Sequence, residues 1–176
     1  MTDWQNRIIG LEHIPANQLL AHPHNARRHP AKQREALRGS LDTLGWYDAV
    51  IYNKRTGYLI DGHARVEEQL TRDENALVPA LVVDLTEAEE AQALASHDWI
   101  TQLAEYDRNT LDELLRMTNS DDTHVQVMLS EMAEAEGVMP PDFSPVPIDE
   151  QLRLDEFKPQ MVTCPHCGVS FDARQV

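Results

Sequence analysis

The first hundred residues alternate between short apolar runs and longer amphipathic stretches, which predicts strands separated by helices. Residues 7–14 are predicted to form a strand. A helix is predicted from 30 to 44, where leucines recur at spacings of three and four on one face and Gly45 supplies a stop. Two apolar runs, 49–52 and 58–60, flank a turn and therefore predict a hairpin.

The same alternation continues toward the middle of the chain. A helix is predicted over 62–72, and the following run, 79–83, lacks polar residues, as expected for a strand covered on both faces. Three more helices are predicted after it: one from a capping box of Thr86 with Glu89 toward Glu105, one near 108–118 and one near 121–136. The pattern thus predicts an α/β (α+β) fold with a small mixed sheet, followed by a helical segment.

A change of composition after residue 137 predicts the end of the packed structure, because residues 139–147 contain four prolines. We predict four parts: an α/β domain over 1–105, an acidic helical extension over 106–137, a Pro-rich linker over 138–161 and a knuckle over 162–176.

The bulk properties restrict the class of protein. A chain of 176 residues suits one sizeable core, and no apolar run approaches the roughly 20 residues that span a bilayer. The N-terminus has no basic stretch followed by an apolar one, so we read no secretory signal and expect a cytoplasmic protein without a membrane partner.

The net charge of −15 is unevenly distributed along the chain. Residues 1–85 contain 10 Lys+Arg and 11 Asp+Glu, whereas residues 86–176 contain 5 and 19. Because such an acidic half repels a phosphate backbone, broad non-specific binding to duplex DNA is disfavoured, and any contact with nucleic acid is expected in the first half.

Cys164 and Cys167 are the only cysteines, and their spacing is typical of half a zinc ribbon. Zinc takes four ligands, so His166 or His124, a second copy of the chain in a homodimer, or a partner protein would complete the site. The alternative is a remnant of a knuckle that binds no metal.

The segment from Asp61 to Arg65 carries the clearest candidate chemistry. An apolar strand runs into Gly62 and then into a helix, an arrangement in which the first helical amides bind a phosphate and Arg65 adds a charged fork. The alternative is an ordinary turn in which Asp61 caps the helix and Arg65 points into solvent.

The order of motifs resembles the ParB/sulfiredoxin superfamily, in particular its ParB-like N-terminal domain. The resemblance covers about residues 8–105. It is carried by Ile14-Pro15, Leu19-Leu20, Asn25-Ala26-Arg27-Arg28, Leu44-Gly45, Ala49-Val50-Ile51, Leu59-Ile60-Asp61-Gly62-His63-Ala64-Arg65 and Val78-Pro79-Ala80-Leu81-Val82-Val83.

This resemblance implies a fold that binds nucleotide phosphates, with CTP in ParB proteins and ATP or ADP in other members. It implies that the nucleoside triphosphate is held by Gly62, His63, Ala64 and Arg65 in one turn and by Asn25, Arg27 and Arg28 in a loop.

Departures from the family pattern limit what is carried over. Sulfiredoxins have a catalytic cysteine where this chain has His63, so that activity is excluded. ParB partition proteins usually have Glu-Arg-Arg after the glycine, whereas this chain has His-Ala-Arg. This difference leaves specificity for CTP and its hydrolysis open, with Asp61 and His63 as catalytic candidates. No helix-turn-helix reader follows, and the sequence is more similar to short ParB-like domains of phage and mobile elements, often called nuclease domains.

Two further regions are candidates for ligand binding. Residues 22–38 form the only basic patch, a candidate contact for DNA whose alternative is a solvated helix face. Asp98 aligns with an asparagine that family members carry near the nucleotide, so Asp98 and Asp61 are candidate Mg²⁺ ligands, although an exposed helix acid is the simpler interpretation.

Three functions follow. The first is a ParB-like nucleotide-binding protein that acts in DNA transactions. The second is a non-enzymatic acidic adaptor or inhibitor that binds a protein through the helical half and the knuckle. The third is a metal-dependent nuclease, and the sequence leaves open whether the protein is an enzyme.

Overall fold

The computed structural model describes residues 3–141, 161–163 and 170–172. The chain divides into two compact units, residues 1–143 and residues 144–176, and each is described by itself. No helix of the described residues is long and apolar enough to cross a membrane.

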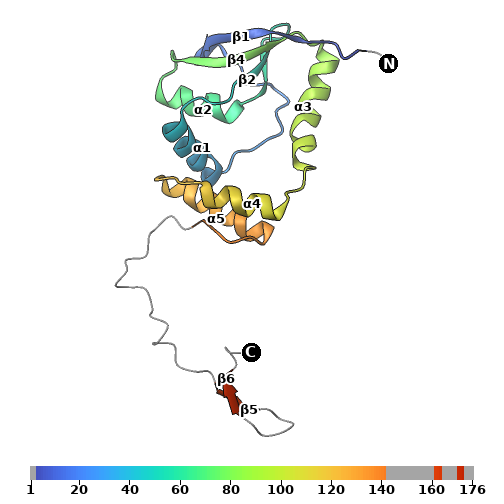
Figure 1. The fold of residues 1–176 in the computed structure, drawn as a ribbon. Helices are drawn as coiled ribbons and strands as arrows, with labels where there is room; N and C mark the ends of the chain where they lie inside the picture. The colour runs from blue at the N-terminus through green and yellow to red at the C-terminus, as the bar shows by residue number, and fades with distance from the viewer. Residues whose placement is uncertain (1–2, 142–160, 164–169, 173–176) are drawn as a thin grey trace. The chain divides into compact units, whose positions relative to one another are not determined.

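The first unit is built on a four-stranded mixed sheet (Figure 1). Its strands are β1 (Ile8–Pro15), β2 (Val50–Asn53), β3 (Tyr58–Asp61) and β4 (Leu77–Val83), in the spatial order β1-β4-β2-β3. β2 runs parallel to β4, whereas β1–β4 and the β2–β3 hairpin are antiparallel. The predicted fold class, with its hairpin and its mixed sheet, is confirmed.

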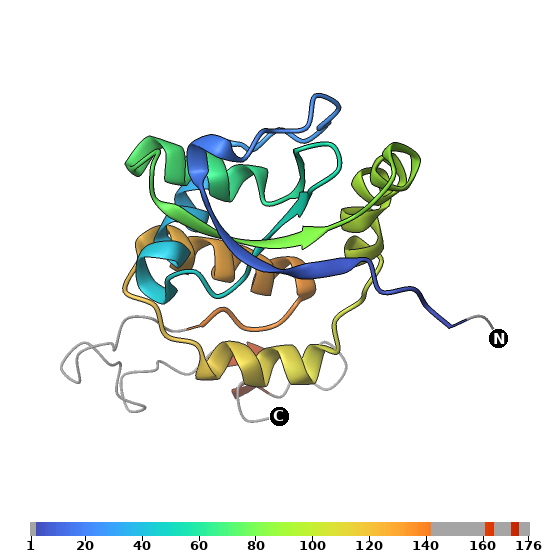
Figure 2. The same cartoon turned by 90° about the horizontal axis from the view of Figure 1, so that it is seen from above.

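Within the described residues 3–141, five α-helices surround this sheet or extend from it (Figures 1 and 2). They are α1 (Ala31–Leu44), α2 (His63–Arg72), α3 (Glu87–Gln102), α4 (Arg108–Met117) and α5 (Thr123–Glu136). A short 3-10 helix, η1 (Ala16–Gln18), follows β1. All five helices lie where the sequence predicts them, and the predicted capping box of Thr86 with Glu89 is present.

The core lies between the sheet and the helices on one side of it. Val50, Leu59, Val66, Val78 and Ala80 are buried there. The expectation that β4 is covered on both faces is wrong along most of the strand: Val78, Ala80 and Val82 are buried, but on the other face Pro79 and Leu81 are only half-buried, Leu77 is 58% exposed and Val83 alone is buried. Helices α1 and α2 lie on one side of the sheet, so the opposite face keeps part of its apolar surface in water (Figures 1 and 2).

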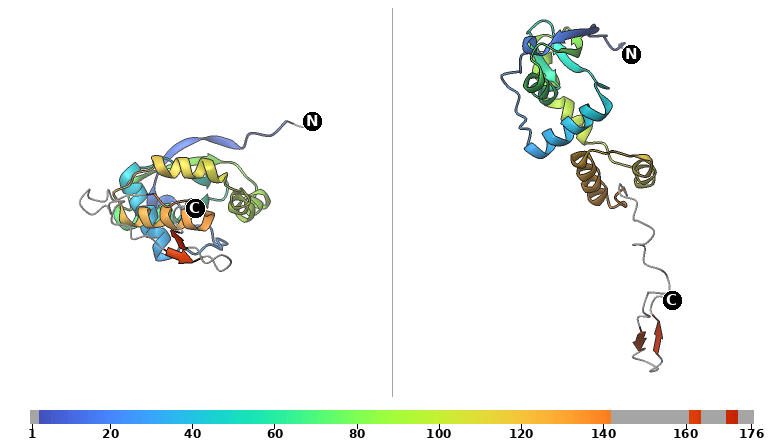
Figure 3. Two further views of the ribbon diagram at one scale, coloured as in Figure 1. Left: turned by 60° about the horizontal axis from the view of Figure 1, so that its bottom comes forward. Right: turned by 90° about the vertical axis from the view of Figure 1, so that its left-hand side faces the viewer.

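The helical extension packs on α1 rather than on the sheet. Helices α4 and α5 bury Leu111, Leu115 and Ala133 against each other (Figure 3). α5 then approaches α1 closely, because a Cβ atom on Gly39 would overlap the carboxylate of Asp122. The extension predicted over 106–137 therefore shares a compact unit with the α/β part of the chain.

The second unit contains an antiparallel pair of strands, β5 (Met161–Thr163) and β6 (Ser170–Asp172). The predicted zinc ligands Cys164 and Cys167, the candidate His166 and most of the Pro-rich linker lie outside the described residues.

Candidate functional site

The turn between β3 and α2 is built around Gly62. Its φ of 90° lies in the left-handed region, and a Cβ atom there would overlap the side chain of Val50 in the neighbouring strand. Both constraints require glycine. The backbone of the turn is thereby fixed at the point where the helix begins.

The structure decides between the two interpretations of this turn. Helix α2 has no side-chain hydrogen bond at its N-cap, so Asp61 does not cap it. Arg65 is not solvated either: its side chain is 14% exposed, and its guanidinium donates to Asp61 at 2.7 Å and to Asp48 at 2.6 Å. The ordinary capped turn is therefore ruled out, and the first amides of α2 are left without a side-chain acceptor.

His63, the first residue of α2, is buried and serves the packing of the site. Its Nε2 accepts a hydrogen bond from the backbone N–H of His22 at 3.2 Å. Burial lowers the pKa of His63, with the neighbouring His29 acting in the same direction and Asp61 opposing it. A neutral imidazole that is already engaged as an acceptor offers no positive charge to a phosphate.

The loop before α1 folds over the turn through its own backbone contacts. The side-chain oxygen of Asn25 accepts from the N–H of Arg27 at 3.1 Å, and the N–H of His24 donates to Nδ1 of His22 at 3.0 Å. Asn25 therefore shapes the loop. This conformation directs Arg27 across the site, where it forms an ion pair with Asp98 of α3.

Buried polar contacts hold α3 against the hairpin and so form the far wall of the site. Glu90 is 3% exposed and accepts hydrogen bonds from Asn53, at 3.1 Å, and from Thr56. Nε2 of His22 lies 3.6 Å from the same carboxylate. These contacts tie α3, the β2–β3 turn and the loop together, and none of them is apparent from local sequence patterns.

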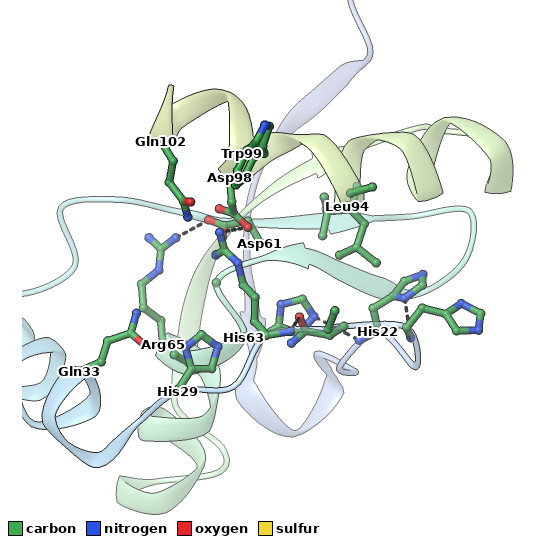
Figure 4. A pocket seen from close by; sticks show the side chains of 18 of the residues that line it. His22, His29, Gln33, Asp61, His63, Arg65, Leu94, Asp98, Trp99 and Gln102 are labelled. Atoms are coloured by element: carbon green, nitrogen blue, oxygen red, sulfur yellow. Dashed lines mark hydrogen bonds and ion pairs between the residues drawn. The ribbon is translucent and has the colours of Figure 1, made fainter. Parts of the chain in front are cut away.

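The loop, the turn and α3 enclose a cavity of about 740 Å³. Figure 4 shows side chains from these three segments directed toward one another. The cavity brings together almost all the candidate residues of the two predicted phosphate motifs, with Arg28 as the exception. Part of its wall is apolar, formed by Leu37, Ile60, Ala91, Leu94 and Trp99, and histidine and glutamine side chains line the cavity as well.

Asp61 and Asp98, the two predicted metal-side carboxylates, line this cavity together, and a third group, the exposed His97, lies close to both. A ligand atom of His97 and one from each carboxylate all lie within 4.8 Å of one another. Sequence reasoning missed His97, because it treated the segment only through the residue that aligns with the family asparagine. Its position beside Asp98 was the available signal.

The basic patch over 22–38 is largely neutralised by ion pairs. Glu68, buried on α2, pairs with Arg34 at 2.7 Å and with Arg38 at 2.8 Å, and Lys32 pairs with Glu131. Burial raises the pKa of Glu68, but hydrogen bonds from Arg38 and Arg34 outweigh burial and hold the pKa below its ordinary value. Most of the predicted positive charge therefore holds helices together.

Comparison with solved structures places ParB N-domains among the similar folds. The chain is similar to C-terminally truncated ParB from Caulobacter crescentus, complexed with CTP-gamma-S (20% identity, TM-score 0.47, 71% of this chain and 65% of that one). It is also similar to a Pnob8-like ParB-N domain in its C2221 form (16%, 0.46, 77% and 67%) and to a second structure of the pNOB8-like domain (16%, 0.46, 98% and 57%).

The chain thus spans 57 to 67% of the length of these three structures. No protein-family model and no curated protein matches the sequence. These likenesses concern the course of the chain, so the chemistry of the site has to be argued from its own side chains.

Proposed function

We propose that the protein is a ParB-like nucleotide-binding protein that holds a nucleoside triphosphate, with Mg²⁺, between the turn at 61–65 and the loop at 25–28. The observation that carries this proposal is the shared cavity, in which an uncapped helix N-terminus faces two arginines from separate segments. Helix amides and arginine forks are the groups that proteins use most often for phosphate oxygens.

The charges in the cavity explain why a metal ion belongs to this proposal. Arg27 and Arg65 bring two positive charges, and Asp61 and Asp98 bring two negative ones, so the charges of these four side chains cancel. A triphosphate would meet both carboxylates at close range. A divalent cation between carboxylates and phosphate removes this repulsion.

The apolar wall suits the other end of a nucleotide. Leu37, Leu94 and Trp99 line the cavity, and a base has two flat faces that favour such contacts. The cavity volume of about 740 Å³ lies in the usual range of roughly 300–1,000 Å³ for ligand sites. No side chain on this wall identifies one base.

Isothermal titration calorimetry with ATP, ADP, CTP and GTP in the presence of Mg²⁺ tests the proposal. We expect heat with at least one nucleotide and at least tenfold weaker binding by Arg65→Ala. Arg55→Ala is a matched control, because Arg55 forms an ion pair with Asp84 and does not line the cavity. Absence of heat with every nucleotide from a folded wild type would refute it.

A role in DNA transactions, in a phage or mobile element, remains part of this proposal. Ion pairs with glutamates engage several basic side chains of residues 22–38 and so reduce the positive charge available to DNA. Arg28, however, is exposed and has no ion pair within the described residues. A filter-binding assay with and without nucleotide tests this role. DNA retention that Arg28→Ala does not weaken would remove the loop as the contact.

The adaptor function has an observation of its own. On α3 and the segment after it, Trp99, Ile100, Leu103 and Tyr106 are 56 to 65% exposed. Side chains as exposed as Trp99, Leu103 and Tyr106 do not contribute to the core of the described residues. Exposed apolar clusters of this kind mark contacts with proteins. Unlike the nucleotide proposal, this function predicts a partner that binds equally to wild type and Arg65→Ala.

The nuclease alternative gains paired carboxylates but no lysine. Asp61 and Asp98 now lie together, yet no lysine is among the described residues that line the cavity. Incubation of plasmid with Mg²⁺ or Mn²⁺ tests this class. Cleavage that disappears in Asp98→Asn would support it, and intact plasmid with both metals would exclude it.

A further inference from the structure

Asp61, His97 and Asp98 together offer two carboxylate oxygens and one imidazole nitrogen as metal ligands. Mg²⁺ binds oxygen ligands and does not need the nitrogen. We propose that these three residues form a site for a divalent transition-metal ion, of the Mn²⁺ or Zn²⁺ class. This metal site is expected to bind its ion in the absence of a nucleotide. Its coupling to phosphate rests on the proposed nucleotide binding.

The three donors come together through tertiary structure. Asp61 is the last residue of β3, whereas His97 and Asp98 lie near the end of α3, and β3 and α3 are in contact. The donor atoms lie within 4.8 Å of one another. Ligands around a transition metal are about 3 Å apart, so small side-chain rotations bring the three onto one ion.

The imidazole determines which metals are preferred. Mg²⁺ takes oxygen ligands and keeps several waters, whereas Mn²⁺ and Zn²⁺ also accept a histidine nitrogen. His97 is exposed, so its ring meets no packing obstacle to rotation toward the carboxylates. We therefore expect His97 to contribute to Mn²⁺ binding and to contribute nothing to Mg²⁺ binding.

The arginines couple this metal site to phosphate. In the structure Arg65 pairs with Asp61, and Arg27 pairs with Asp98, so each carboxylate that would bind the ion is held by a cation. A metal ion has to displace both guanidiniums. A phosphate group gives the two released guanidiniums new acceptors, so metal and nucleotide should strengthen each other's binding by an exchange of ion-pair partners.

Electron paramagnetic resonance of Mn²⁺ titrated into the metal-free full-length chain tests the site, and competition by Mg²⁺ gives the second affinity. Mn²⁺ is the suitable probe because thiolates prefer Zn²⁺, so Cys164 and Cys167 interfere little. We expect His97→Ala and Asp98→Asn to weaken Mn²⁺ binding by about tenfold or more. His97→Ala should leave the Mg²⁺ affinity unchanged, and the exposed His13→Ala should change neither.

Two further measurements separate this inference from the proposed function. Arg27→Gln releases Asp98 and is expected to tighten Mn²⁺ binding in the absence of nucleotide, an effect that mere loss of structure does not produce. Equal Mn²⁺ affinity in wild type and His97→Ala overturns the metal site, even where a nucleotide binds with Mg²⁺. Mn²⁺ binding that every nucleotide leaves unchanged overturns the coupling while the metal site stands, and absence of calorimetric heat with every nucleotide overturns the proposed function.

Discussion

Single residues in the candidate site are constrained by backbone conformation and burial more than by charge. Gly62 combines a left-handed conformation with the close approach of Val50, whereas Gly57 has a φ of 80° and no atom nearer than 4.0 Å. Gly10 has neither constraint. Comparison of the three glycines therefore separates the free-energy cost of a left-handed backbone conformation from the cost of steric overlap with a new Cβ atom.

We predict a graded loss of stability when each of these glycines is replaced by alanine. Gly10→Ala should be near neutral, Gly57→Ala should cost about 1–2 kcal/mol for the left-handed conformation, and Gly62→Ala should cost about 3 kcal/mol or more because overlap is added. Urea unfolding measures the series. Equal losses at Gly57 and Gly62 would show that Val50 moves aside freely.

His63 makes stability depend on pH. Its pKa is lowered by burial in the folded chain, so the unfolded chain binds more protons as the pH falls through the ordinary histidine value of about 6.5. The free energy of unfolding should therefore decrease from pH 7.5 to pH 5.5, since protonation also removes the acceptor for the N–H of His22.

Urea unfolding of wild type and His63→Gln at both pH values measures this contribution. His63→Gln keeps an acceptor but cannot be protonated, so it should show a smaller loss at pH 5.5. His13→Gln, at an exposed position on β1, is the control and should behave like wild type. An identical pH dependence in all three proteins would contradict a buried neutral His63.

At the scale of elements, close helix contacts depend on small residues. The buried residues of α1 are Ala36 and Gly39, whereas Leu44, one of the leucines that suggested the helix, is 66% exposed. Helix α1 thus packs through a face of small side chains. Asp122 lies over Gly39 and also caps α5 by accepting from the N–H groups of His124 and Val125, both at 2.9 Å.

Gly39→Ala is expected to destabilise the chain by about 2 kcal/mol, because the new methyl group overlaps the carboxylate of Asp122. Asp122→Ala alone should cost about 1 kcal/mol through the lost cap. In the double variant the overlap is absent. Its loss of stability should therefore be smaller than the sum of the losses in the two single variants. A double-mutant cycle by urea unfolding measures the difference, and strict additivity would mean that α5 does not lie this close to α1.

At the scale of the whole molecule, we expect the acidic half and the C-terminal cysteines to take part in binding other protein chains. We propose that Cys164 and Cys167 bind zinc and that a second copy or a partner protein completes the site. Among the described residues, none after Gln102 lines the cavity of the first unit, so we expect the two activities to be separable.

Cys164→Ser combined with Cys167→Ser is expected to abolish zinc binding and to leave nucleotide affinity unchanged. Atomic absorption gives zinc per chain, and native mass spectrometry gives the number of chains. About half a zinc ion per chain in a dimer would show that two copies share one site. Wild type that binds no zinc would remove the knuckle from the proposal.

The sequence by itself determined the elements of this protein. Apolar spacing, the glycine stops and the Thr86 capping box specify helix and strand locally, since each depends on neighbours within a few positions. The strand-to-helix turn at Gly62 could also be predicted, because the apolar strand, the glycine and the amphipathic helix follow one another directly along the chain.

Only the tertiary structure decided which charges remain available and which groups meet. Arg27 pairs with Asp98, and Arg34 and Arg38 pair with Glu68, across separations that no local pattern encodes. The burial of His63 and the approach of His97 to Asp61 likewise depend on how α3 and the loop pack on the turn. Periodicity fixes the face of an element, whereas its partner is chosen by packing across the whole fold.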